Sequence, residues 1–343
     1  MIYACYAMPQ NSKRRPKSRS SRGAALLAVL WLAAALSAIA FTLATTVRGE
    51  TERSSTEADA LKAYYLAEGA IDRMLVYIES GPGAFSGADG KPLFRQDVTR
   101  FLVLNYPSGV ARVDYIPENS KLDVNKATPA ELTNLMLALG VDLERAQQIV
   151  AGIVDWRGGT PGGAFTQFDQ YYLSLTPSFQ ARHASVEEIE ELLLVRGITP
   201  DLFYGRYTRD GEGRPLAHSG LRDCLSVYGS TGTLDVNGVA PEVMVSLGVP
   251  PESAAAIVAR RKLIPITDMN QLAGLNIGRG GGRLGKNGGP IVTLRATAQM
   301  RLPTGQLSEV RRTVSAMIKQ RVGGNANPQF QIMRWYDDAP ILQ

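Results

Sequence analysis

Cysteine and histidine are scarce in this sequence of 343 residues. It has two cysteines, Cys5 and Cys224, and two histidines, His183 and His218. Two cysteines cannot form a disulfide scaffold or a four-ligand zinc site, and two histidines leave little room for a histidine-rich metal centre. The remaining composition, 45% apolar and 20% charged, is that of a globular protein, and the length allows about two or three domains.

Catalytic motifs are equally scarce. Residues 280–286 have the spacing G-x-x-x-x-G-K of a phosphate-binding loop, but Asn287 stands where Ser or Thr is required, so we expect a flexible linker. His183 and His218 lie in polar, loop-like stretches and are expected at the surface. Cys224 is expected to be a small buried residue rather than a reactive thiol. With no acid–base pair and no metal cluster evident, the sequence predicts a protein that is not an enzyme.

Acidic residues are missing from the N-terminal tail, residues 1–23, which contains six basic residues. Without this tail the formal net charge falls from +5 to −1. The basic character therefore belongs to the tail and not to a folded surface. A nucleic-acid-binding domain would carry it on its folded face, so we predict no nucleic-acid partner.

Charge is absent from the next segment, Ala24–Val47. A helix of this length spans roughly 36 Å, enough for a hydrocarbon core of about 30 Å. The basic tail should stay in the cytoplasm, which places the rest of the chain on the far side of the membrane. A cleaved signal peptide and a simple anchor are the alternatives, but the run is longer than a signal sequence and no clear A-x-A site follows it.

An internal repeat lies further along the chain. Leu122–Asn125 reads Leu-Asp-Val-Asn and recurs at Leu234–Asn237, and a weaker third copy covers Ser185–Gly197. Capping boxes are predicted for Thr128 with Glu131 and for Ser185 with Glu188, and first-turn prolines at Pro129 and Pro241. Left-handed C-terminal glycines are expected at Gly140, Gly197 and Gly248. The pattern predicts three helix–turn–helix units of the helix-hairpin-helix or SAM-like type.

Hairpins of this type often bind DNA phosphates through a second glycine in the turn. Here that position holds Asp142, Thr199 and Pro250 in the three copies. Aspartate repels phosphate and proline has no N–H to donate. A role in packing or protein interaction is therefore favoured over DNA binding.

Strand patterns flank the repeats on both sides. They are predicted at Gly109–Ile116, Ile291–Ala298, Leu307–Ile318 and Phe330–Trp335, with a turn at Pro303–Gly305. Before them, an amphipathic stripe continues the apolar helix through Leu61, Tyr64, Tyr65, Ile71, Leu75 and Ile78. We expect an α+β fold in which a long N-terminal helix joins an antiparallel sheet, and a large all-helical domain is inserted into that sheet.

Several of these features together resemble a known family. Gly23 precedes the apolar run as in a prepilin leader, Ala28 stands at the fifth position where pilins usually have Glu, and Tyr64–Glu68, the Leu-Asp-Val-Asn repeats and Ile153–Arg157 follow in order. Over nearly its whole length the chain resembles protein K of the type II secretion system, a minor pseudopilin.

The resemblance implies processing between Gly23 and Ala24 by a prepilin peptidase. It implies a pilin-like fold and association with minor pseudopilins I and J at the tip of a periplasmic pseudopilus. It also implies calcium, for which Asp155 and Asp169 are weak candidates, because most of the family's acidic ligands are missing and caps or turn residues are the favoured roles. Ala28 offers no carboxylate to a neighbouring subunit, which suits the end of a filament.

The predicted organisation follows from these assignments. We expect a leader at 1–23, a transmembrane helix at 24–47, a helix continuation with the first strands at 48–119, an inserted helical domain at 120–278, and a Gly-rich linker with the last strands at 279–343. The expected location is the bacterial inner membrane, with a single span, a cytoplasmic N-terminus and a periplasmic bulk. A membrane-anchored DNA-binding protein and a type IV pilus tip subunit remain the alternatives.

Overall fold

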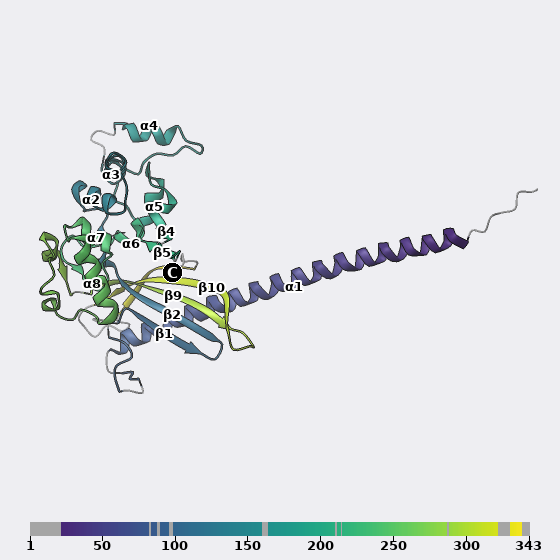
Figure 1. Ribbon diagram of the computed structural model, residues 1–343. Helices are drawn as coiled ribbons and strands as arrows, with labels where there is room; N and C mark the ends of the chain where they lie inside the picture. Colours follow the sequence, from purple (N-terminus) through teal and green to yellow (C-terminus); the bar gives the residue numbers. More distant parts are fainter. Residues whose placement is uncertain are drawn as a thin grey trace, which may run out of the picture. The chain divides into compact units, whose positions relative to one another are not determined.

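The computed structural model describes residues 22–81, 84–87, 90–95, 99–159, 164–209, 211–213, 215–286, 288–321 and 330–337. The chain divides into two compact units, Met1–Ala58 and Asp59–Gln343. Helix α1, Arg22–Ser80, contributes to both (Figure 1). The predicted long helix is thus confirmed, and the described residues of the first unit all belong to it.

In the second unit, α1 packs against the sheet through Ile71 and Leu75 of the predicted stripe and through a row of small residues that the stripe did not include. Ala63, Ala67 and Ala70 are fully buried, whereas Leu61 and Tyr65 are 57% and 60% exposed. The stripe is therefore wrong at these two positions. Alanine has little volume, so the helix backbone can approach the strands closely where Ala63, Ala67 and Ala70 are buried.

The sheet has five antiparallel strands in the order β1-β2-β9-β10-β11. Their bounds are β1 Phe101–Tyr106, β2 Gly109–Pro117, β9 Ile291–Arg301, β10 Leu307–Gln320 and β11 Phe330–Tyr336. Four of the five were predicted from alternation, and the turn at Gly305 has the positive φ of 85° that glycine adopts without strain. On β9 the residues Val292, Leu294 and Ala296 pack with α1, so Thr293 and Arg295 face the opposite side.

Residues 118–290 lie between β2 and β9, and most of them surround a separate hydrophobic core. Their elements are η1 Glu118–Ser120, β3 Leu122–Asp123, α2 Pro129–Ala138, α3 Leu143–Arg157, α4 Gln167–Leu173, η3 Ile189–Leu194, α5 Pro200–Tyr204, β4 Arg206–Arg209, β5 Pro215–His218, α6 Leu221–Cys224, β6 Leu225–Ser226, β7 Leu234–Asp235, α7 Pro241–Ser246, α8 Pro251–Leu263, η4 Met269–Leu272, η5 Arg279–Arg283 and β8 Leu284–Gly285. Three two-stranded pairs, β3–β6, β4–β5 and β7–β8, make the expectation of an all-helical segment wrong. Strands β3 and β7 are the Leu-Asp of the two repeats, each paired in parallel with a distant strand, whereas β4 and β5 pair with each other in antiparallel orientation.

The predicted flexible linker is also wrong for residues 279–285. They form η5 and β8, and β8 pairs in parallel with β7, the strand of the second repeat. A Cβ on Gly280 would lie 2.8 Å from the carbonyl oxygen of Leu247. The glycines at this point therefore permit close backbone contact instead of flexibility.

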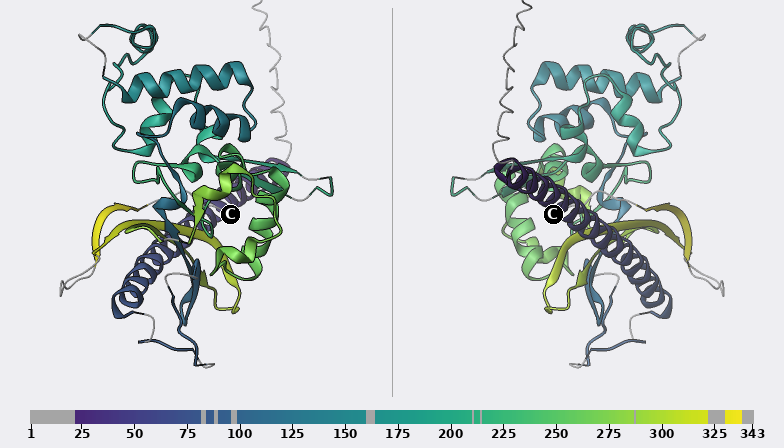
Figure 2. Two further views of the ribbon diagram at one scale, coloured as in Figure 1. Left: turned by 90° about the vertical axis from the view of Figure 1, so that its left-hand side faces the viewer. Right: turned by 90° about the vertical axis from the view of Figure 1, so that its right-hand side faces the viewer.

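The first and second repeats each form a helix pair, α2 with α3 and α7 with α8. Figure 2 shows the two pairs side by side. Gly140, Gly197 and Gly248 have φ of 82°, 90° and 94°, as predicted for helix C-termini. The capping box of Thr128 with Glu131 and the first-turn prolines are confirmed.

The weaker third copy departs from its prediction. Its first helix is the short 3₁₀ helix η3, which begins at Ile189, and the capping box is formed by Glu188 with Glu191 rather than by Ser185 with Glu188. Glu188 and Glu187 donate backbone N–H groups to the Glu191 carboxylate, so the chain turns into the helix three residues later than expected.

Candidate functional site

The asparagine of each Leu-Asp-Val-Asn repeat ties its loop to a distant segment. Asn125 donates from Nδ2 to the carbonyl oxygen of Val186 at 2.9 Å and accepts from the Val186 N–H at 2.7 Å. Asn237 makes the same pair of bonds with Ile266, both at 2.8 Å. Each side-chain amide thus bonds both the N–H and the C=O of one backbone residue, as a neighbouring strand would. This explains why both copies carry asparagine, which has a donor and an acceptor in one side chain.

An arginine from the second helix of each pair holds the same loop. Arg157 donates to the carbonyl oxygens of Val124 and Ala127, the latter at 2.7 Å. Arg261 donates to the carbonyl oxygens of Val236 and Val239 at 2.8 and 2.7 Å. We call these two arrangements the asparagine–arginine clamps.

Sequence reasoning missed the arginines of these clamps. Arg157 lies one helical turn further past its glycine than Arg261 does, so the position-by-position alignment of the repeats did not pair them. The available signal was a basic residue in the last turn of each second helix. Each clamp therefore ties the repeat loop to the second helix of its pair.

Asp155 and Asp169, the weak calcium candidates, meet around His183. His183 Nε2 lies 2.9 Å from Asp169 Oδ1, and its Nδ1 lies 3.1 Å from the backbone oxygen of Asp155. Both neighbours are acceptors when Asp169 is ionised, so the ring donates from both nitrogens as an imidazolium. The prediction of a surface histidine is wrong here, because the loop after α4 folds back over α3 and leaves the ring only 18% exposed.

The electrostatics agree with this assignment. Burial alone lowers the pKa of His183, but hydrogen bonds to Asp169 and to the Asp155 backbone outweigh it and raise the pKa above its ordinary 6.5. Burial raises the pKa of Asp169, and the Thr166 N–H together with His183 reverses this, so the net direction is downward. Burial raises the pKa of Asp155.

The cluster does not fit calcium. Asp169 is the capping-box residue of α4, which confirms the predicted role as a cap. It accepts from the Thr166 N–H at 3.0 Å while it pairs with His183. Calcium requires six to eight oxygen ligands, and an imidazolium between the carboxylates repels a cation. The described residues include no group of three or more His, Cys, Asp or Glu side chains suited to a metal ion. Thr160–Gly163, between the two aspartates, lie outside the described residues.

Replacing His183 with glutamine is expected to destabilise the fold in a pH-dependent manner. A raised histidine pKa stabilises below about pH 6.5, and a lowered aspartate pKa stabilises above about pH 4, so the ion pair acts between these limits. We expect a loss of about 1 kcal/mol near pH 6 and a smaller loss at pH 9. Unfolding of the full chain in detergent across pH measures it. His218→Gln is the matched control, and a difference that does not change with pH would contradict the ion pair.

Two other single residues were predicted from the sequence. Cys224 is fully buried and burial raises the pKa of its thiol well above the ordinary value, which confirms a buried small residue. His218 is half-buried on β5, where its Nε2 lies 2.7 Å from the hydroxyl oxygen of Thr208.

The predicted membrane helix, Ala24–Val47, lies in the first unit. Within the described residues, one helix is long and apolar enough to cross a membrane, and it contains the uncharged run. Ala24 and Ala28 lie on α1, and Gly23 is near its first residue, Arg22. The rest of the predicted leader, residues 1–21, lies outside the described residues. A single apolar N-terminal helix of this kind is consistent with single-pass anchoring.

A long apolar helix followed by an antiparallel sheet packed on its second half defines the class of pilin-like subunits. Residues 111–205 match the family described as Type II secretion system (T2SS), protein K. A chain of the GspK-GspI-GspJ complex from the enterotoxigenic Escherichia coli type 2 secretion system has the same fold, with a TM-score of 0.54 and 14% sequence identity, over 83% of this chain and 98% of that one. No curated protein matches. Residues 111–205 thus resemble the protein K domain of the type II secretion system, and the chain has the fold of GspK.

Proposed function

We propose that this protein is a minor pseudopilin of the type II secretion system and that it occupies the tip of the pseudopilus, together with minor pseudopilins of types I and J. The observation that carries the proposal is Ala28, an uncharged side chain in the apolar segment of α1. A subunit in the body of a pilus-like filament uses a carboxylate at this position to pair with the amino terminus of its neighbour, and alanine has none to offer. The E. coli complex supports the choice of partners, since it contains GspI and GspJ beside GspK.

The bulk of residues 118–290 supports the same position. This segment is inserted between β2 and β9 of the pilin-like sheet and has its own core. We propose that it is a separate inserted domain, too wide to fit between stacked subunits, and that the clamps keep it rigid during assembly. The role is structural, with no catalytic step.

The membrane topology belongs to the same proposal. A prepilin peptidase would cut between Gly23 and Ala24, on the cytoplasmic side, and residues 24–47 would hold the protein in the inner membrane before packing into the pseudopilus. The six basic residues of the tail support a cytoplasmic N-terminus, because basic flanks are retained on that side. The second unit would then lie in the periplasm.

One purification from native membranes tests the whole proposal. The full chain, tagged at its C-terminus, is expected to have the mass of residues 24–343 plus the tag and to co-purify with minor pseudopilins I and J. A Gly23→Leu variant, which places a bulky residue at the cut, is the matched control and should retain the tail. An intact tail in the unaltered protein, a cut beyond Val47, or purification without either partner would contradict the proposal.

A further inference from the structure

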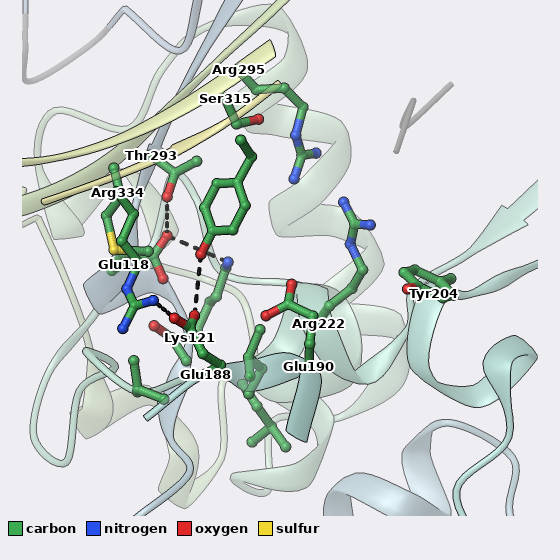
Figure 3. A pocket seen from close by; sticks show the side chains of 16 residues that line it. Glu118, Lys121, Glu188, Glu190, Tyr204, Arg222, Thr293, Arg295, Ser315 and Arg334 are labelled. Atoms are coloured by element: carbon green, nitrogen blue, oxygen red, sulfur yellow. Dashed lines mark hydrogen bonds and ion pairs between the residues drawn. The ribbon is translucent and has the colours of Figure 1, made fainter. Parts of the chain in front are cut away.

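A cavity of about 470 Å³ lies where the outer face of the sheet meets the 118–290 segment. Its walls come from η1, the start of η3, α6 and β6 on one side and from β9, β10 and β11 on the other. The volume is within the range of small-molecule sites. Figure 3 shows its charged side chains converging from both sides.

Arg295 is the most unusual residue of this cavity. It projects from the face of β9 that points away from α1, and it is only 8% exposed. Among the described residues its guanidinium has no hydrogen bond and no ion pair, and its Nε is fully enclosed. Asp114, its register partner on β2, instead accepts from Arg112 Nε at 2.8 Å. A buried unpaired cation is costly unless a counter-charge joins it.

A second unpaired donor lies beside it. Ser315 on β10 is the register partner of Arg295 and lines the same cavity, and its hydroxyl oxygen is buried with no hydrogen-bond partner in the described structure. The two side chains therefore form a strand-supported donor pair. Buried polar groups in folded proteins are nearly always hydrogen-bonded, so two adjacent exceptions indicate a missing partner.

Arg222 on α6 completes the group from the opposite wall. Figure 3 shows its guanidinium pointing toward that of Arg295, and its carbon lies 5.5 Å from the ring centre of Tyr204. Burial first, and then the charge of Arg222, lower the pKa of Arg295 to about 10. Two like charges face each other across the cavity, which an anion between them would relieve.

The remaining charges of the cavity, apart from Glu190, are already paired. Glu118 accepts from the Thr293 hydroxyl at 2.7 Å and pairs with Lys121, and Glu188 pairs with Arg334. Glu190 is different, because it lines the cavity yet forms no ion pair within the described structure. It is exposed, and its negative charge opposes the entry of an anion.

We propose that Arg295, Arg222 and Ser315 form a binding site for an oxyanion, with a carboxylate as the best-fitting group. The guanidinium groups supply charge and forked N–H donors, and the serine supplies a hydroxyl donor. The carboxylate can belong to a free organic acid or to an acidic side chain of a partner pseudopilin. The site joins the sheet to the 118–290 segment, so its occupant would stiffen the junction between them.

Isothermal titration of the full chain in neutral detergent, with citrate and with sulfate at constant ionic strength, tests the site. We expect saturable binding that weakens at least tenfold in Arg295→Met and in Arg222→Gln. Arg295→Met replaces an unpaired buried charge with an apolar chain of similar length, so its unfolding midpoint should be unchanged or higher. Glu190→Gln should bind about threefold or more tightly, and Arg260→Gln, at an exposed arginine of α8, should bind as the unaltered protein does.

The outcomes are distinct. The proposed site is overturned if no saturable binding occurs up to about 10 mM, which is taken as the weakest affinity of a built site. It is also overturned if Arg295→Met binds as tightly as the unaltered protein. Titration of the purified complex with pseudopilins I and J separates the two sources, and this arm alone rests on the proposed partners. Unchanged citrate affinity in the complex supports a free acid, whereas binding that is lost in the complex but present in the single chain supports a partner carboxylate.

Discussion

Replacing Arg261 with leucine is expected to lower the free energy of unfolding by about 3–5 kcal/mol. The variant leaves the carbonyl oxygens of Val236 and Val239 without their donor. It also removes a positive charge near the buried carboxylate of Asp235, which then has only Arg100, at 2.8 Å, to balance it. The pKa of Arg261 is lowered to about 10, chiefly by burial and in opposition to Asp235, which shows how far the guanidinium is removed from water.

The neighbouring arginine provides the control for this variant. Arg260 is exposed on the same turn of α8, so Arg260→Leu should change stability by less than about 0.5 kcal/mol. Arg261→Lys keeps the charge but loses the planar fork, and an intermediate loss is expected. Denaturant unfolding of the full chain in detergent measures all three. Equal losses in Arg260→Leu and Arg261→Leu would show that the clamp contributes nothing specific.

If the subunit occupies the tip as proposed, introducing glutamate at position 28 is expected to release it from the tip of the filament. A carboxylate in the apolar segment costs up to about 3 kcal/mol when it is alone, and it recovers that cost only by pairing with a cationic group such as a neighbour's amino terminus. In Ala28→Glu, incorporation into the filament body relative to the tip should rise at least tenfold, which corresponds to about 1.4 kcal/mol of new pairing energy. Secretion should fall as tip complexes are lost.

Two matched variants separate pairing from general disturbance of the helix. Ala28→Gln has nearly the same shape without the charge, and it should remain at the tip. Ala33→Glu has the charge one and a half turns further into the apolar run, where it should reduce membrane insertion without promoting body incorporation. Cross-linking to body and tip subunits, with secretion measured in the same cells, gives the readout. If Ala28→Glu stays at the tip, the argument from the missing carboxylate is wrong.

Local patterns allowed much of the fold to be predicted. Alternation located four of the five strands, and the helix starts at Thr128 and Pro241 and the helix ends at Gly140 and Gly248 were readable because they depend on neighbours in the chain. Strand β1 was missed because its exposed positions hold apolar residues, among them Phe101 and Val103, so its sequence does not alternate between apolar and polar residues. The order of the predicted elements along the chain carried the family resemblance.

Long-range pairings were beyond such patterns. His183 was expected at the surface because its loop is polar, and only the fold brings it to Asp169 and Asp155. Arg295 lies in a strand that was predicted correctly, but it has no ion pair among the described residues because the carboxylates of Asp114 and Glu118 accept from Arg112 and Thr293 instead. Side chains separated by many residues meet only after the chain has folded.

The amino-acid order by itself determined the long apolar helix, the uncharged Ala28 within it, the positions of most strands and the helix caps, because each depends on residues close together in the chain. The repeat was recognised from the recurrence of Leu-Asp-Val-Asn at two places in the sequence. Tertiary structure alone decided that the glycine-rich stretch at 279–285 is ordered, that two arginines clamp the repeats, and that His183 lies between Asp155 and Asp169, the two weak calcium candidates. These features depend on distance in space and on burial, which set the energy of a charge or hydrogen bond and which no local pattern records.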